Sequence, residues 1–312
     1  MRTHSPSVVV GVDGSEPAAA AAHAAALEAD RRRAQLRLVR AFHWPAGDLP
    51  GLPDAYEACA AARRSANADL ERLRRALAGH RPAGAVSAEL LDGRPETALC
   101  RVTRPGDLLV VGASGLTWGA GDVLGSVAEA VAATATCPVL VHRRPNRLGR
   151  RRSGVVVGVD GAAGTREVLA AAATEAELRG EPLRVVHAWR QLTEDAVHPL
   201  RWRIDVQASA DAGSAAVAPQ VAELQRRHPD LTVDTEIRPG RAGQVLVEAA
   251  GTAALLVVGR RDVVHGGPGA TVHSVLHRVE VPVLTVPVPA PTARTAEPTG
   301  RTVSAVAGPL EG

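Results

Sequence analysis

The sequence contains no lysine and few aromatic residues, and both absences exclude classes of function. All 36 basic residues are arginines, so the chain lacks the lysine with which a classical P-loop contacts nucleotide phosphates. One Phe, one Tyr and four Trp offer little surface for stacking nucleobases. The net charge of +3 is small for 312 residues, and the arginine-rich run from Arg143 to Arg152 contains no aromatic residue. We therefore expect a solvated linker at this run and no nucleic-acid partner.

Cysteine and long hydrophobic runs are also scarce. Cys59, Cys100 and Cys137 are odd in number, widely spaced and without a C-x-x-C pair, which argues against a disulfide framework and against a zinc site. We expect buried free thiols. No apolar stretch reaches the length of a membrane span, and the amino-terminal MRTHSPS lacks the apolar core of a signal peptide. These features predict a cytoplasmic globular protein with no membrane partner.

Internal repetition is the strongest signal in the chain. VVVGVDG at Val8–Gly14 recurs at Val155–Gly161, an offset of 147 residues (155 − 8). The same offset places the LLVVG of Leu108–Gly112 on that of Leu255–Gly259. A period this long indicates two copies of a whole domain rather than a solenoid. We expect one domain over residues 1–145, a second over 146–288, and a disordered Pro- and Ala-containing tail over 289–312.

Each copy alternates strand-like and helix-like segments. In the first copy we expect strands at residues 8–12, 36–41, 86–91, 108–111 and 138–142. Helices are expected between them, the first capped by Ser15 and the second running from about Asp54 to Ala78. The second copy repeats this order. Alternation of this kind predicts an α/β fold in which each copy forms a five-stranded parallel sheet with helices on both faces.

The segment Asp107–Ser126 joins a buried strand to a helix through a glycine-spaced loop. In open α/β sheets ligands bind at this strand edge, and the N–H groups of a helix start favour a phosphate. Glycines let the backbone approach such a ligand closely. An alternative needs no ligand, because Ser126 and Glu129 form the S-x-x-E pattern of a helix capping box.

These motifs together resemble the universal stress protein family, in its tandem two-domain form. The resemblance rests on VVVGVDGS, LRLVRAF, VVGASG followed by nine residues and GS, and CPVLV, and it covers residues 8–142 and 155–288. It implies a nucleotide-hydrolase-like fold whose ATP-binding members hold the nucleotide at the carboxyl ends of the strands. The family pattern G-x-x-G-x9-G-S/T is met by Gly112, Gly115, Gly125 and Ser126.

The resemblance also implies roles for residues of the first strands. Gly11 and Asp13 match the family's nucleotide pocket, and Ala41 lies where a backbone group meets the adenine. A carboxylate such as Asp13 can accept hydrogen bonds from ribose hydroxyls or help hold Mg²⁺. As an alternative, Asp13 belongs to the helix start, where it competes with Ser15 for the cap. The expected ligand is ATP, with magnesium as an implied companion ion.

The second copy departs from the pattern in its phosphate loop. Gly158, Asp160 and Gly259 are retained, but Asp262 replaces the next glycine. The loop is three residues shorter before Gly269, and Ala270 replaces the serine. We therefore predict a weaker second site at Gly158, Asp160, Gly259 and Gly269, and tighter ATP binding by the first domain.

Catalytic residues are poorly supported by the sequence. It has no G-x-S-x-G elbow and no cysteine–histidine pairing, and nothing in the sequence marks an orienting partner for His43, His187 or His265. We expect an ATP-binding regulatory stress-response protein rather than an enzyme. Two alternatives remain open: a nucleotide-free scaffold that dimerises, and a weak ATP hydrolase or related enzyme. The apolar closing segments CPVLVH and VPVLTV predict an intramolecular pseudo-dimer, and whole chains could also pair as a homodimer.

Overall fold

A computed structural model gives the architecture of this chain. It describes residues 5–44, 55–79, 81–82, 84–115, 124–143, 152–189, 206–261 and 269–288. Among these residues each copy contains five strands and four α-helices, as predicted. The predicted tail and most of the arginine-rich linker lie outside the described residues.

The elements of the first copy follow the predicted order. They are β1 (Ser7–Gly11), α1 (Glu16–Arg32), β2 (Gln35–Phe42), α2 (Ala55–Ala78), β3 (Val86–Asp92), α3 (Pro95–Val102), β4 (Leu108–Gly112), α4 (Ser126–Thr134) and β5 (Val139–His142).

The second copy repeats this order and adds a short 3₁₀ turn. Its elements are β6 (Val155–Val159), α5 (Thr165–Arg179), β7 (Leu183–Trp189), α6 (Val206–Arg227), β8 (Val233–Pro239), α7 (Ala242–Ala249), η2 (Ala250–Thr252), β9 (Leu255–Arg261), α8 (Ala270–Arg278) and β10 (Val283–Val288).

Local sequence explains where α1 begins and ends. The Ser15 hydroxyl accepts a hydrogen bond from the Ala18 N–H, and Pro17 lies in the first turn, where its missing N–H costs nothing. At the other end Arg33 adopts a left-handed conformation with φ of 50° and closes the helix through its backbone N–H. The predicted serine cap is confirmed.

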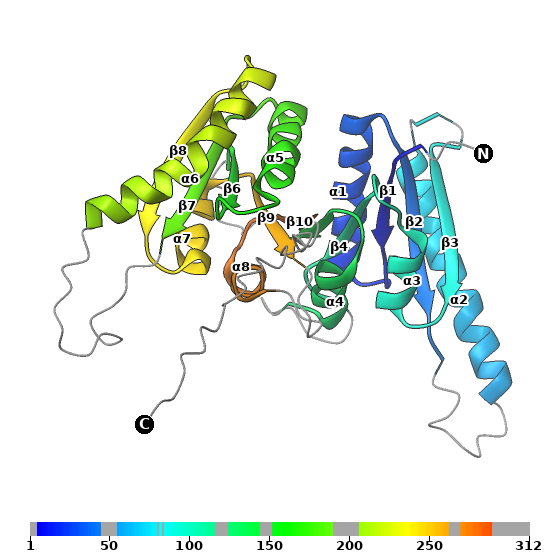
Figure 1. Ribbon diagram of the computed structural model, residues 1–312. Coiled ribbons are helices and arrows are strands. Elements are labelled where there is room, and N and C mark those ends of the chain that lie inside the picture. Colours follow the sequence, from blue (N-terminus) through cyan, green and yellow to red (C-terminus); the bar gives the residue numbers. More distant parts are fainter. Residues whose placement is uncertain are drawn as a thin grey trace, which may run out of the picture.

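The described strands form one continuous sheet in the order β3-β2-β1-β4-β5-β10-β9-β6-β7-β8. Pairing is parallel within each copy, and Val8, for example, lies opposite Leu36 on one side and Leu108 on the other. At the centre β5 and β10 pair antiparallel, with Leu140 opposite Leu284. The two copies are therefore joined through their last strands, as the closing segments predict (Figure 1).

Helices cover both faces of the sheet. One apolar cluster packs the buried faces of α1, α2, α5 and α6 against it, and a second does the same for α3, α4, α7 and α8. Alanines fill much of α1, where Ala21, Ala22 and Ala25 are fully buried. Small side chains of this kind let the helix lie close to the strands.

A buried charge network also joins the two copies. Glu28 of α1 pairs with Arg179 of α5 at 2.5 Å, and Glu175 of α5 pairs with Arg32 of α1. Each glutamate also pairs with the arginine four residues later on its own helix. Glu28 and Glu175 are separated by the repeat offset of 147, so the network is symmetric about the junction.

The cysteines depart in part from expectation. The structure shows all three as free thiols, but only Cys137 is buried, while Cys59 and Cys100 are partly exposed. The prediction of three buried thiols was wrong because helices α2 and α3 leave part of these two side chains on their outer faces. Burial raises the pKa of the Cys137 thiol above its usual value.

Candidate functional site

The seven residues predicted from the first copy all line one cavity, which we call the domain 1 cavity. Its volume is about 430 Å³, and it lies at the carboxyl ends of β1, β2 and β4. That volume falls within the range of about 300–1,000 Å³ typical of small-molecule sites. The lining residues are Gly11, Asp13, Ala41, Gly112, Gly115, Gly125 and Ser126. Residues more than 110 positions apart in the sequence are thus brought together.

The glycine at position 115 allows a close approach to Asp13. A Cβ atom added at Gly115 would lie 2.6 Å from the Asp13 Oδ2 atom, which is closer than any real Cβ contact. At Gly112 an added Cβ would lie 3.2 Å from the carbonyl oxygens of Pro17 and Ser114. The backbone at Gly115 therefore lies next to the Asp13 carboxylate. Side chains at positions 112 and 115 would occupy part of the cavity edge.

Asp13 takes part in the turn before α1 without displacing the cap. Its Oδ1 atom accepts a hydrogen bond from the Ser15 N–H at 2.8 Å, while the Ser15 hydroxyl caps the helix. The two side chains thus share the helix start rather than compete for it. This bond orients the Asp13 carboxylate at the edge of the cavity.

Ser126 is not a helix cap, so the capping-box alternative is wrong. The N-cap of α4 is Gly125, with no side-chain cap bond, and the Glu129 side chain instead bonds to His273 at 3.0 Å. Because Ser126 is the first helical residue, its side chain is not positioned to receive an N–H from the following turn. The start of α4 therefore has N–H groups without intrahelical acceptors beside the cavity.

Gly125 joins the start of α4 to the end of β4. Its N–H donates to the carbonyl of Ala113 at 2.7 Å, so this group already has an acceptor within the protein. Any backbone donors that α4 offers to a ligand come from Ser126 and the residues after it. Gly125 lines the cavity but does not supply the donor.

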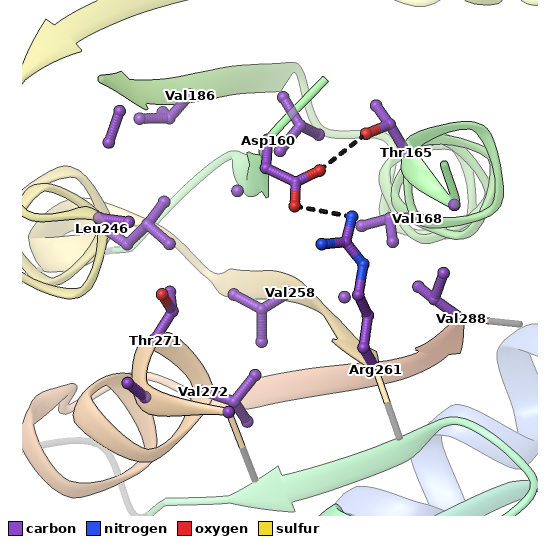
Figure 2. A pocket seen from close by; sticks show the side chains of 18 of the residues that line it. Asp160, Thr165, Val168, Val186, Leu246, Val258, Arg261, Thr271, Val272 and Val288 are labelled. Atoms are coloured by element: carbon purple, nitrogen blue, oxygen red, sulfur yellow. Dashed lines mark hydrogen bonds and ion pairs between the residues drawn. The ribbon is translucent and has the colours of Figure 1, made fainter. Parts of the chain in front are cut away.

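The second copy encloses a smaller cavity at the equivalent place, the domain 2 cavity, of about 260 Å³. Gly158, Asp160, Gly259 and Gly269 all line it. Figure 2 shows Asp160 engaged on both sides, by the Thr165 hydroxyl at 3.3 Å and by the Arg261 guanidinium at 2.8 Å. Arg261 thereby neutralises the carboxylate that corresponds to Asp13.

Val288, the last residue of β10, also lines the domain 2 cavity. β10 runs six residues, two more than β5, and its last residue lies beside α5. A Cβ at Gly164 would lie 1.8 Å from Val288 Cγ1, and Gly164 has a φ of +94° that favours glycine. In the close-up, Val288 sits at the rim of the cavity on the α5 side (Figure 2).

Gly11 and Gly158 have the same packing role in both copies. A Cβ at Gly11 would lie 2.8 Å from Leu99 Cδ1, and one at Gly158 would lie 2.6 Å from Leu246 Cδ1. Leu99 and Leu246 are themselves related by the repeat offset. These two glycines are therefore explained by helix packing as well as by their place at a cavity.

Two cavity residues were missed from the sequence. Arg261 ends β9 directly before Asp262, and its side chain turns to Asp160; Asp262 lies outside the described residues. Arg40 precedes Ala41 on β2, lines the domain 1 cavity and donates to the Ala66 carbonyl at 3.3 Å. The repeat alignment carries the available signal: Arg261 stands at the position of Ser114, and His187 at that of Arg40.

His43 and His187 lie in different copies and differ in exposure. His43 is exposed and lines the domain 1 cavity, whereas His187 is buried, with its Nδ1 atom 3.0 Å from the Val159 carbonyl. His265 lies outside the described residues.

Among the described helices none is long and apolar enough to span a membrane.

Comparison with known proteins agrees with this architecture. A model of the Universal stress protein family matches residues 5–143 and again 153–287. The universal stress protein MT2087 of Mycobacterium tuberculosis is 34% identical over 279 residues, which cover 86% of this chain and 92% of the relative. The Mycobacterium bovis protein Mb2028c is 30% identical over 291 residues, covering 89% and 95%.

A solved structure shows the same fold at low identity. A universal stress protein from Archaeoglobus fulgidus has a TM-score of 0.64 and 16% identity, covering 90% of this chain and 98% of that one. At such identity the likeness concerns the fold alone.

Proposed function

The chain belongs to the universal stress protein family, and we propose that its first domain binds an adenine nucleotide, ATP, at the domain 1 cavity. Nucleotide occupancy would then regulate the conformation or association of the chain in a stress response. The observation that carries this proposal is the convergence of all seven predicted residues on one cavity.

The glycine loop fits a phosphate chain. Gly112 and Gly115 have no side chain, so a ligand can approach their backbone closely. Side chains at these positions would crowd the edge of the cavity. The start of α4 lies beside the loop, and the positive end of its dipole attracts anions. A magnesium ion bound with the phosphates would neutralise part of their charge.

The nucleoside would lie on the side of β1 and β2. Asp13, held by the Ser15 N–H, accepts hydrogen bonds from ribose hydroxyls or binds the companion ion. Ala41 presents its backbone to the adenine, as the family resemblance implies. Phe42 lines the same cavity and stacks on Trp44, with ring centroids 6.5 Å apart, which adds an apolar surface on that side.

The domain 2 cavity supports a scaffold role for the second copy. Asp160 is already paired with Arg261, and Val288 lines the same cavity next to Gly164. We infer that Gly158, Asp160, Gly259 and Gly269 form a site that binds nucleotide weakly, and that the domain contributes mainly through its pairing with domain 1. Hydrolysis is not assigned to either cavity, because no described histidine there has an orienting partner suited to general base catalysis.

Titration of ATP with magnesium into the intact chain and into Gly115→Asp tests the proposal. The substitution places a carboxylate against Asp13, so binding should fall at least a hundredfold. Gly251→Asp is the matched control, because it adds the same charge at a glycine with open space around it. Equal loss in both variants, or binding retained in Gly115→Asp, would overturn the assignment, and circular dichroism checks that both variants fold.

A further inference from the structure

Glu129, His273 and His277 meet at the junction of the two domains. Glu129 lies on α4 of the first copy, whereas both histidines lie on α8 of the second. Counted from the helix caps Gly125 and Gly269, Glu129 and His273 occupy equivalent positions, 144 residues apart. The group therefore lies across the axis that relates the two copies, where α4 and α8 approach each other (Figure 1).

The three side chains have the separations of a metal-ligand set. Glu129 Oε1 lies 3.0 Å from His273 Nδ1 and 3.7 Å from His277 Nε2. All three ligand atoms lie within 4.8 Å of one another. Ligands bound to zinc at about 2.0–2.1 Å in tetrahedral geometry lie roughly 3.3 Å apart, so small rotamer changes would suffice to enclose an ion.

The spacing of the two histidines along α8 places their side chains together. His273 and His277 are four residues apart and so lie on the same face of α8. Their rings are 4.3 Å apart between centroids, which directs two nitrogens to the same space. Such a pair at i and i+4 is a recurrent arrangement of two zinc ligands on one helix.

We propose that Glu129, His273 and His277 bind a divalent transition metal, Zn²⁺ in particular, between the two domains. Two imidazoles and one carboxylate suit zinc and its neighbours Co²⁺ and Ni²⁺, whereas Mg²⁺ and Ca²⁺ prefer oxygen alone. The side chains are one third to one half exposed, so water can complete the coordination. The ion would link α4 to α8, and thus the two halves of the chain.

The sequence alone hides this group, because its members are 144 residues apart and only the His-x-x-x-His spacing is local. The competing explanation is an interdomain ion pair between Glu129 and a protonated histidine. The two explanations differ in their response to added metal. The proposal also does not depend on the nucleotide assignment, since none of its ligands has a role in the domain 1 cavity.

Calorimetric titration of ZnCl₂ into the full chain, freed of any affinity tag and of bound metal, tests the site. One ion should bind per chain, and His273→Ala and Glu129→Gln should each lower its affinity at least tenfold. His228→Ala is the matched control, because His228 pairs with Glu177 at 2.6 Å and the described residues place no third ligand beside that pair. It should leave zinc binding unchanged.

Cobalt gives a second readout, through the visible absorption of tetrahedral Co²⁺. The intact chain should show it, and the His273→Ala variant should not. Zinc should also raise the melting temperature of the intact chain and not that of the variant. Absence of stoichiometric binding, or equal binding by His273→Ala and the intact chain, would leave only the ion pair and overturn the proposal.

Discussion

The two cavities occupy equivalent places in two copies of one fold, yet they differ in what surrounds their carboxylates. Asp13 faces a glycine that leaves room beside it, whereas Asp160 is bound by Arg261. The cavities differ in volume as well, about 430 Å³ against 260 Å³. Sheet, helix order and packing glycines are the same in both. The fold therefore determines the position of each cavity, at the carboxyl ends of the strands. A few residues at the strand ends and in the loops determine how much space a ligand has there.

The contact between α1 and α5 shows the opposite behaviour, because there both copies carry the same residues at equivalent positions. Glu28 and Glu175 form reciprocal pairs with Arg179 and Arg32. Each carboxylate is nearly buried, so its partners are needed to offset the cost of desolvation. The two copies thus differ in their cavities but match in this contact between α1 and α5.

The largest effect is expected when the domain 1 cavity receives the arginine of the domain 2 cavity. This substitution tests whether Arg261 explains the difference between the two cavities. In Ser114→Arg the guanidinium should pair with Asp13 and occupy the loop, and ATP affinity should fall about a hundredfold, which corresponds to about 2.7 kcal/mol. Ser87→Arg, on the exposed side of β3, is the matched control for calorimetry. Unchanged binding in Ser114→Arg would show that Arg261 does not close the second site.

The symmetry of the interface predicts equal costs on its two sides. Glu28→Gln and Glu175→Gln should each lower the free energy of unfolding by roughly 2–3 kcal/mol, since either removes one of the two carboxylates that Arg32 and Arg179 share. Urea denaturation followed by circular dichroism measures both. A large loss in one variant and none in the other would contradict the reciprocal network.

A smaller difference is expected from the two strand-end aspartates. Asp13→Asn should lower ATP affinity about tenfold, or about 1.4 kcal/mol, because a neutral amide is a poorer acceptor for the ribose and a weaker ligand for a divalent ion than a carboxylate. Asp160→Asn should leave ATP affinity of the chain unchanged. If the two substitutions weaken ATP binding equally in calorimetry, the two cavities contribute equally to binding. That result would contradict tighter binding by domain 1.

The smallest effect concerns Cys137, whose equivalent in the second copy is Val281. The raised pKa of this buried thiol keeps it protonated near neutral pH, where it behaves as a small apolar side chain. Cys137→Val should therefore change the free energy of unfolding by less than about 1 kcal/mol. A larger loss in thermal denaturation would mean that the sulfur has a role beyond filling space.

Most of the fold could be predicted because its signals are local or repeated. Buried apolar runs marked the strands, Ser15 marked a helix start, and the repeat of 147 residues carried each assignment from one copy to the other. The seven residues of the domain 1 cavity could also be predicted from the sequence, since a parallel sheet brings the carboxyl ends of its strands to one edge.

The rest depended on contacts that no pattern specifies. The S-x-x-E spacing allowed a capping box at Ser126, but Glu129 turns instead toward a histidine of the other domain. The pairing of Arg261 with Asp160 depends on the direction of a long side chain, and the exposure of Cys59 and Cys100 depends on how α2 and α3 rotate against the sheet. Such side-chain geometry follows from tertiary packing rather than from periodicity.

The most direct test of the central claim is to locate bound ATP with a photoreactive adenine analogue. The intact chain would be irradiated with azido-ATP, with and without excess ATP, and labelled peptides identified by mass spectrometry. We expect labelling, suppressed by ATP, in the segment of Ala41–His43 and none at residues 183–189 of β7. Labelling of β7 alone, or of both segments equally, would contradict a nucleotide site in domain 1.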